Sequence, residues 1–173
     1  GTGSGGRVMN PTTLVELDEG AYMEMETTQI KGINDTLRKT GGKLAAGASL
    51  VIREKIMTTG DQRAETDFSV DLDGEDSSAN VVSRSVAKDT SRQVFRSVIN
   101  GNNKCAGHTE CDAIIMDSAS VTAMPQLTAN SVEASLIHEA AIGKIAGEQL
   151  VKLMTLGLTE EEAEAEILDD FLS

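Results

Sequence analysis

Four short stretches decide the fold: LDEGA (17–21), LAAGA (44–48), DLDGE (71–75) and VINGN (98–102). Each glycine in them is separated from the next by 27 residues, at Gly20, Gly47, Gly74 and Gly101. Self-similarity with a period in the twenties is typical of stacked supersecondary units. A glycine at one place in each unit predicts a corner that needs positive φ or a close approach of the backbone.

The segments around these glycines are short, rich in β-forming residues and bounded by turn residues: YMEMETTQI (22–30), SLVIREKIM (49–57), TDFSVDLD (66–73), NVVSRSVA (80–87) and AIIMD (113–117). Aromatic residues are scarce, so aliphatic side chains must build the core. We therefore expect an all-β body over residues 11–132, a parallel β-helix whose coils bury their faces against one another. An antiparallel sandwich is the alternative, but its turn signals come about every 8–12 residues.

Residues 133–173 have a different character and predict a helical segment. The stretch 133–157 is rich in Ala, Leu, Glu and Lys, which are good helix formers. Gly157 can cap that helix, and Thr159 with Glu162 forms a capping box for a second one. Ala163, Ile167 and Phe171 then fall on one apolar stripe.

Charge and motifs limit the partners. The net charge of −13 repels phosphate backbones and anionic lipid, so we expect no nucleic acid and no membrane partner. Two free cysteines fit a cytoplasmic setting. The opening GTGSGGRVMN (1–10) departs from a Walker loop and is expected to be a flexible linker or an expression remnant.

The stretch KCAGHTEC (104–111) holds both cysteines and one of the two histidines. If it is extended, Cys105 and Cys111 share a face about 20 Å apart, and His108 points to the opposite face. One metal ion cannot bridge them, so a closed zinc site is not expected. His138 and Glu139 do not complete a metalloprotease motif, because Ile142 stands where its second histidine belongs.

Three segments resemble the SufB/SufD family of the SUF iron–sulfur cluster assembly system: SRSVAKDTSRQVFRSVI (83–99), CDAIIM (111–116) and HEAAIGKIAGEQLVKLMTLGLTEEEA (138–163). The resemblance covers about residues 80–171. It implies a right-handed parallel β-helix with a C-terminal helical segment. It also implies a non-enzymatic scaffold that pairs with a second SufB/SufD-type chain and holds a SufC-type ABC ATPase. An iron–sulfur cluster would be assembled transiently on the complex, and ATP would be bound only by the ATPase.

The resemblance also implies site residues. His138 matches the family's histidine before the helical segment, and Cys111 matches a cysteine of SufB-like members. Both are implied iron ligands, with Glu139 beside them at the paired interface. Ala129 stands where SufB has a further cysteine, which favours a SufD-like or archaeal-type homologue. The implied ATPase-docking residues are Glu148, Gln149, Leu150, Leu153, Gly157, Leu158, Ala163 and Phe171.

Two other functions stay open. A structural β-solenoid adaptor would bind protein without iron–sulfur chemistry. A small β-helix enzyme acting on sugars or lipids would need paired carboxylates in register on one face, and Asp71 and Asp73 share a face by alternation.

Overall fold

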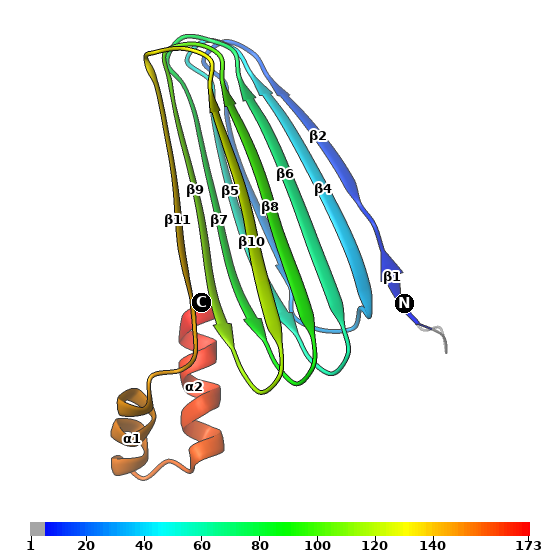
Figure 1. Cartoon of the computed structure of the whole chain (residues 1–173), viewed down its shortest axis with the longest axis vertical. Coiled ribbons are helices and arrows are strands. Elements are labelled where there is room, and N and C mark those ends of the chain that lie inside the picture. Colours follow the sequence, from blue (N-terminus) through cyan, green and yellow to red (C-terminus); the bar gives the residue numbers. More distant parts are fainter. Residues whose placement is uncertain (1–5) are drawn as a thin grey trace.

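The structure is a computed structural model that describes residues 6–173, and it is a parallel β-solenoid followed by two helices (Figure 1). One sheet contains β1 (Val8–Met9), β2 (Thr12–Leu17), β4 (Asp35–Leu44), β6 (Arg63–Leu72), β8 (Arg92–Gly101) and β10 (Ser120–Ala129). The other contains β3 (Tyr22–Gln29), β5 (Ser49–Thr58), β7 (Ser77–Ala87), β9 (Cys105–Ile115) and β11 (Ala134–Gly143). The chain passes from one sheet to the other in each coil, which confirms the predicted solenoid.

The strands pair in parallel with an offset that is not constant. Tyr22 pairs with Ser49, 27 residues on, whereas Ser49 pairs with Ser78, 29 residues on. In the facing sheet Asp35 pairs with Arg63 and Arg63 with Arg92, offsets of 28 and 29. The strict 27-residue period is therefore wrong beyond the first coils, because later coils contain one or two additional residues.

The glycines show where the period breaks. Gly20 and Gly47 lie at equivalent corners with φ of 68° and 66°, as predicted. The next corner of this kind is at Asp76, whose φ is 58°. Gly74 instead lies where a Cβ would clash with the backbone of Ala45 and Ala46 in the preceding coil. Glycine is needed at this position because two coils approach closely, not because φ is positive.

The opposite corners are built by a second ladder. Gly60, Asp89 and Asp117 all have positive φ, between 55° and 59°. The Asp89 carboxylate accepts the Gly60 N–H at 2.7 Å, and the Asp117 carboxylate accepts the Asp89 N–H at 3.1 Å. Aspartate tolerates this conformation because its short side chain bonds to nearby backbone. Each coil therefore fixes the turn of the coil before it.

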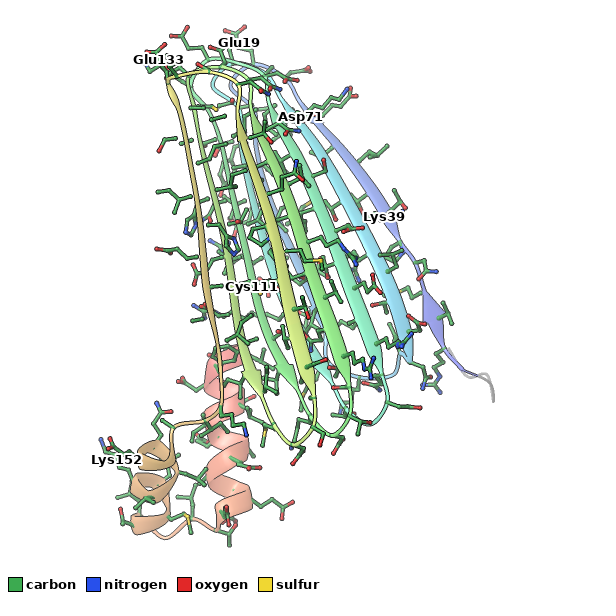
Figure 2. The ribbon with its side chains drawn as sticks, in the orientation of Figure 1. Glu19, Lys39, Asp71, Cys111, Glu133 and Lys152 are labelled. Atoms are coloured by element: carbon green, nitrogen blue, oxygen red, sulfur yellow. The ribbon has the colours of Figure 1, made fainter. Side chains whose placement is uncertain are left out.

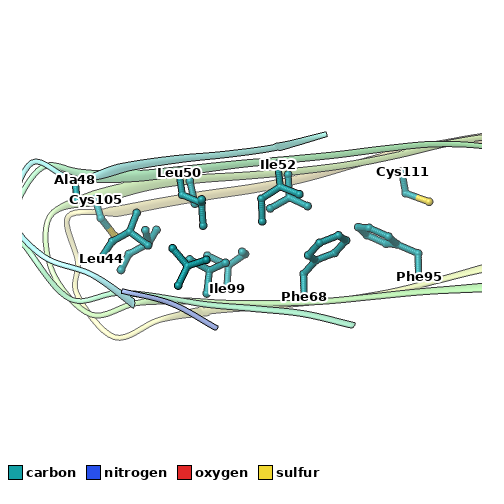
Figure 3. Packing of buried hydrophobic residues seen from close by; sticks show 14 residues of the cluster. Leu44, Ala48, Leu50, Ile52, Phe68, Phe95, Ile99, Cys105 and Cys111 are labelled. Carbon is teal, nitrogen blue, oxygen red and sulfur yellow. The ribbon is translucent and has the colours of Figure 1, made fainter. Parts of the chain in front are cut away.

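The core is a thin aliphatic layer between the two sheets (Figure 3). Inward positions alternate with outward ones along each strand, as in β5, where Leu50, Ile52 and Ile56 are buried. Phe68 and Phe95 supply its aromatic pair, with ring centroids 5.7 Å apart. Cys105 and Cys111 both belong to this core.

The C-terminal region differs from the expectation in one respect. Residues 134–143, expected in a helix, form β11, which pairs with β9 along its whole length. Backbone pairing to an existing strand outweighs the modest helix preference of Ala and Glu here. The helices are α1 (Gly147–Thr155) and α2 (Glu160–Leu172), so the solenoid runs beyond the boundary expected at residue 132.

The helix ends follow the sequence. Gly157 has φ of 101° just after α1, and Thr159 and Glu162 form the predicted capping box at the start of α2. The buried residues of α2 are Ala163, which was expected on its apolar stripe, and Leu168, which was not. Ile167 and Phe171 are only half-buried.

The N-terminal linker is shorter than expected. Within the expected linker 1–10, Val8–Met9 forms β1, and the Arg7 N–H donates to Asn34 at 2.9 Å. Residues 1–5 lie outside the described part. No helix among the described residues has the length and apolar character needed to cross a membrane.

Candidate functional site

Strand β9 positions the stretch KCAGHTEC as predicted. Cys105 and Cys111 point into the solenoid and are buried, whereas His108 lies on the outer face, where about a third of its side chain is exposed. Figure 3 shows Cys105 near Leu44 and Cys111 at the other end of the cluster, across from Phe95. The two thiols are therefore separate, and the prediction that no single ion bridges them agrees with this arrangement.

Cys111 faces a small polar cavity inside the solenoid. The cavity has a volume of about 10 Å³, and its lining includes Glu54, Thr66, Ser83 and Gln93. Burial, then the charges of Glu54 and Asp112, raises the pKa of the Cys111 thiol to about 12. Cys111 is thus a protonated thiol in the chain alone, and it becomes a ligand only where a bound cation stabilises its thiolate.

Glu54 is the functional candidate that the sequence analysis missed. Its carboxyl is fully buried and accepts hydrogen bonds from Thr66 Oγ1 at 2.7 Å and from Ser83 Oγ at 3.0 Å. Burial raises its pKa, and these hydrogen bonds oppose the shift. The available signal was alternation, because Glu54 occupies the inward position between Ile52 and Ile56 in SLVIREKIM.

His138 also turns toward the interior, from the last strand β11. Its Nδ1 lies 2.6 Å from Thr109 Oγ1 on β9. Burial, then the nearby His108 charge, lowers the pKa of His138, which favours the neutral imidazole that binds metals. His138 pairs with Thr109, which is two residues before Cys111 on the neighbouring strand. Strand geometry therefore places the Cα atoms of His138 and Cys111 about 8 Å from each other.

Glu139 does not join Cys111 and His138. It is the residue after His138 and points to the outer face of β11, where its Oε2 lies 3.1 Å from His108 Nε2. His108 Nδ1 in turn lies 2.9 Å from Asn80 Oδ1 on β7. The implied set of His138, Cys111 and Glu139 is therefore divided between two faces of one sheet.

The C-terminal helices lie below one end of the solenoid, and Lys152 marks α1 in Figure 2. Helix α1 buries none of its residues, and its apolar side chains Val151 and Met154, with Leu156 just beyond, are exposed. Of the expected docking residues, Ala163 is fully buried within this chain, so it supports the helix pair rather than a partner surface. The others are exposed or half-buried: Glu148, Gln149, Leu150, Leu153, Gly157, Leu158 and Phe171.

Comparison with known proteins agrees with this architecture. The family model described as SUF system FeS cluster assembly, SufBD core domain, matches residues 3–171. Iron–sulfur cluster assembly SufBD family proteins of three archaea are similar to the chain. The protein of Methanothermobacter thermautotrophicus is 42% identical over 104 residues, which are 59% of this chain and 25% of that protein.

The other two relatives match over most of this chain. The protein of Methanocaldococcus jannaschii is 31% identical over 158 residues, 90% of this chain and 50% of that protein. The protein of Archaeoglobus fulgidus is 30% identical over 166 residues, 95% of this chain and 39% of that protein. This chain therefore spans half or less of the length of these relatives. Since the core-domain model covers nearly all of it, the chain belongs to the SufBD family of SUF-system iron–sulfur cluster assembly proteins.

Proposed function

We propose that this chain is a non-catalytic scaffold that contributes one wall of a cluster-assembly site and holds an ABC-type ATPase of the SufC kind through its C-terminal helices. Cytoplasmic assembly with a second SufB/SufD-type chain completes the proposal. The observation that carries it is that Cys111 and His138 lie on adjacent strands, β9 and β11, and both point to the interior of the solenoid. Thiolates are the usual protein ligands of iron in clusters, and imidazoles replace some of them in Rieske-type clusters.

The last coil supports pairing with a second chain. Strand β10 is at one end of its sheet and β11 is at the same end of the other sheet. Each therefore has an edge without a neighbouring strand among the described residues. A paired chain would cover these edges and close the interior that contains His138.

Helix α1 supports the docking part of the proposal. The exposed apolar side chains Val151 and Met154 lie on α1, with exposed Leu156 just after its end, and the solenoid does not cover this helix. Apolar side chains on one exposed helix are typical of a partner surface. ATP turnover would then occur entirely on the partner.

Anaerobic reconstitution with ferrous iron and sulfide tests the cluster part, and the chain contains its own matched control. Cys111→Ser and Cys105→Ser each replace one buried thiol by a hydroxyl. We expect the visible charge-transfer absorption of a cluster to disappear in Cys111→Ser and to persist in Cys105→Ser. Equal absorption in both variants would contradict the assignment, and absence of a chromophore from every form, the paired complex included, would favour the adaptor function.

Calorimetry with a SufC-type ATPase tests docking independently. We expect the intact chain to bind and Met154→Asp to bind at least about tenfold more weakly, because a charge replaces an apolar contact. Met124→Asp is the control, since Met124 is a similarly exposed methionine on β10. Undiminished binding by Met154→Asp, or no binding by the intact chain, would refute docking through α1.

A further inference from the structure

The outer face of the solenoid brings together three metal-ligating side chains that the proposed assembly function does not use. His108 and Glu110 are on β9, and Glu139 is on β11. One ligand atom from each of the three lies within 4.8 Å of the other two. We propose that His108, Glu110 and Glu139 form a binding site for a divalent first-row transition-metal ion, whose remaining coordination positions are open to water.

Strand geometry fixes this arrangement. His108 and Glu110 share the outer face of β9 because they are two residues apart. Glu139 pairs directly with Glu110 in the parallel register of β11 and β9. The three ligands therefore come from two adjacent, hydrogen-bonded strands. Bonds of about 2.1 Å to one ion would require ligand atoms about 3.0–3.5 Å apart, which small side-chain rotations can provide.

A second observation orients the histidine. Asn80 on β7 pairs in register with His108, and its Oδ1 lies 2.9 Å from His108 Nδ1. The amide oxygen can only accept, so Nδ1 donates to it. Nε2 lies 3.1 Å from Glu139 Oε2, so a cation bound between Nε2 and the carboxylates would take the place of an Nε2 proton. Metal-ligating histidines are typically held by such an outer partner.

The local charge also favours a cation here. Several carboxylates elsewhere on the solenoid pair with cations of the next coil, as Glu26 does with Lys55 at 3.3 Å and Glu65 with Arg96 at 2.8 Å. Among residues 6–173, neither Glu110 nor Glu139 has a lysine or arginine nitrogen within 4.0 Å. Like charges directly opposite on neighbouring strands are destabilising, and a bound cation would remove that cost.

The donors select the kind of ion. Magnesium and calcium prefer shells made of oxygen alone, whereas an imidazole with two carboxylates suits iron(II), manganese, cobalt or zinc. The side chain of Glu139 is 65% exposed, so an ion can enter from solvent. Asp112 is two residues beyond Glu110 on the outer face of β9 and adds a further carboxylate close by. This site faces outward and is separate from Cys111 and His138, so it does not depend on the proposed assembly function.

Zinc titration of the chain in the absence of sulfide tests the site. The chain has two histidines, so its imidazole NMR signals form two sets, one for each candidate site. We expect one ion per chain by calorimetry and a larger shift of the His108 ring signals than of those of His138. A larger shift at His138, or no zinc binding, would overturn the proposal.

Variants of matched charge sharpen this test. We expect Glu110→Gln and Glu139→Gln each to weaken zinc binding by more than about tenfold, a loss that even outer-shell partners can cause. Glu26→Gln removes the same charge from the outer face of the same sheet and should leave affinity unchanged. An equal loss in Glu26→Gln would reduce the effect to general surface charge and refute the site. Circular dichroism establishes that each variant is folded.

Asn80 positions the His108 ring, and this role can be measured separately from metal binding. In Asn80→Ala we expect the ring ¹⁵N shifts of His108 to report a changed tautomer balance, together with about tenfold weaker zinc binding. Unchanged tautomer and affinity would show that Asn80 does not orient the ligand.

Discussion

Substitution of Gly74 by alanine examines the close approach of two coils. The added Cβ would lie closer than 3.0 Å to backbone atoms of Ala45 and Ala46, a separation that real Cβ atoms essentially never show. Backbone cannot rotate away as a side chain can, so two coils must separate. Overpacking typically costs 1–3 kcal/mol, and this position belongs at the upper end, about 3 kcal/mol. For a chain of this size, that loss corresponds to a decrease in Tm of about 6–12 °C.

Alanine substitutions at two other glycines serve as comparisons for the stability loss in Gly74→Ala. At Gly47 a Cβ would make only ordinary contacts, with Gly20 backbone atoms at 3.8 Å, but φ is 66°, so alanine there should cost about 1–2 kcal/mol. At Gly143 a Cβ meets open space, and alanine should change stability by less than about 0.5 kcal/mol. Urea unfolding followed by circular dichroism measures all three. If Gly74→Ala is no worse than Gly47→Ala, the coils are not in the contact described, and the reasoning fails.

Three further substitutions test separate parts of the molecule. The raised pKa of Glu54 means that the folded state retains a proton which the unfolded chain releases; this stability is fully present below pH 4.5 and is lost as pH rises through the folded pKa. As pH rises, the free energy of unfolding of Glu54→Gln should therefore increase relative to that of the wild type, by at most about 1.4 kcal/mol per pH unit. A constant difference between the two free energies, measured by urea unfolding at each pH, would contradict this. Thr159→Ala removes the capping box and should cost about 1 kcal/mol in the stability of α2, measured by amide exchange, whereas Thr155→Ala should not expose α2. The Cys111 thiol has a pKa of about 12, so it should react slowly with a thiol-labelling reagent in the folded chain at neutral pH, and Cys111→Ala should lower the total labelling only slightly. Rapid labelling of Cys111 in the wild type would refute this.

Much of the fold could be predicted from local patterns. Alternation in SLVIREKIM and the glycines at residues 20 and 47 identify strands and corners, because inward and outward positions follow from a strand period of two. The strict repeat could not be extended, since Asp76 replaces glycine at the next corner and no local signal marks the inserted residues. The segment 134–143 was misassigned because its composition favours a helix, whereas its pairing with β9 is set by residues far away in sequence.

The candidate site was predictable only in part. Cys111 and His138 were identified through a family resemblance, and the inward direction of Cys111 follows from alternation. Sequence alone gave no reason to connect His108 with Glu139, which are 31 residues apart and meet only once the coil register is known. Glu54 was hidden in an otherwise apolar run, and its partners Thr66 and Ser83 come from neighbouring strands.

The position of β11 at the end of its sheet has a consequence for local unfolding. In a solenoid each coil is stabilised by its neighbours, so a central strand such as β7 is held on both sides and β11 on one. Amide protection should therefore fall along the sheet from β7 through β9 to β11. His138 lies on the strand that detaches most easily, whereas Glu54 lies on a strand that is paired on both sides. Fraying of the last coil would uncover the Cys111 thiol to solvent while the rest of the solenoid stays folded.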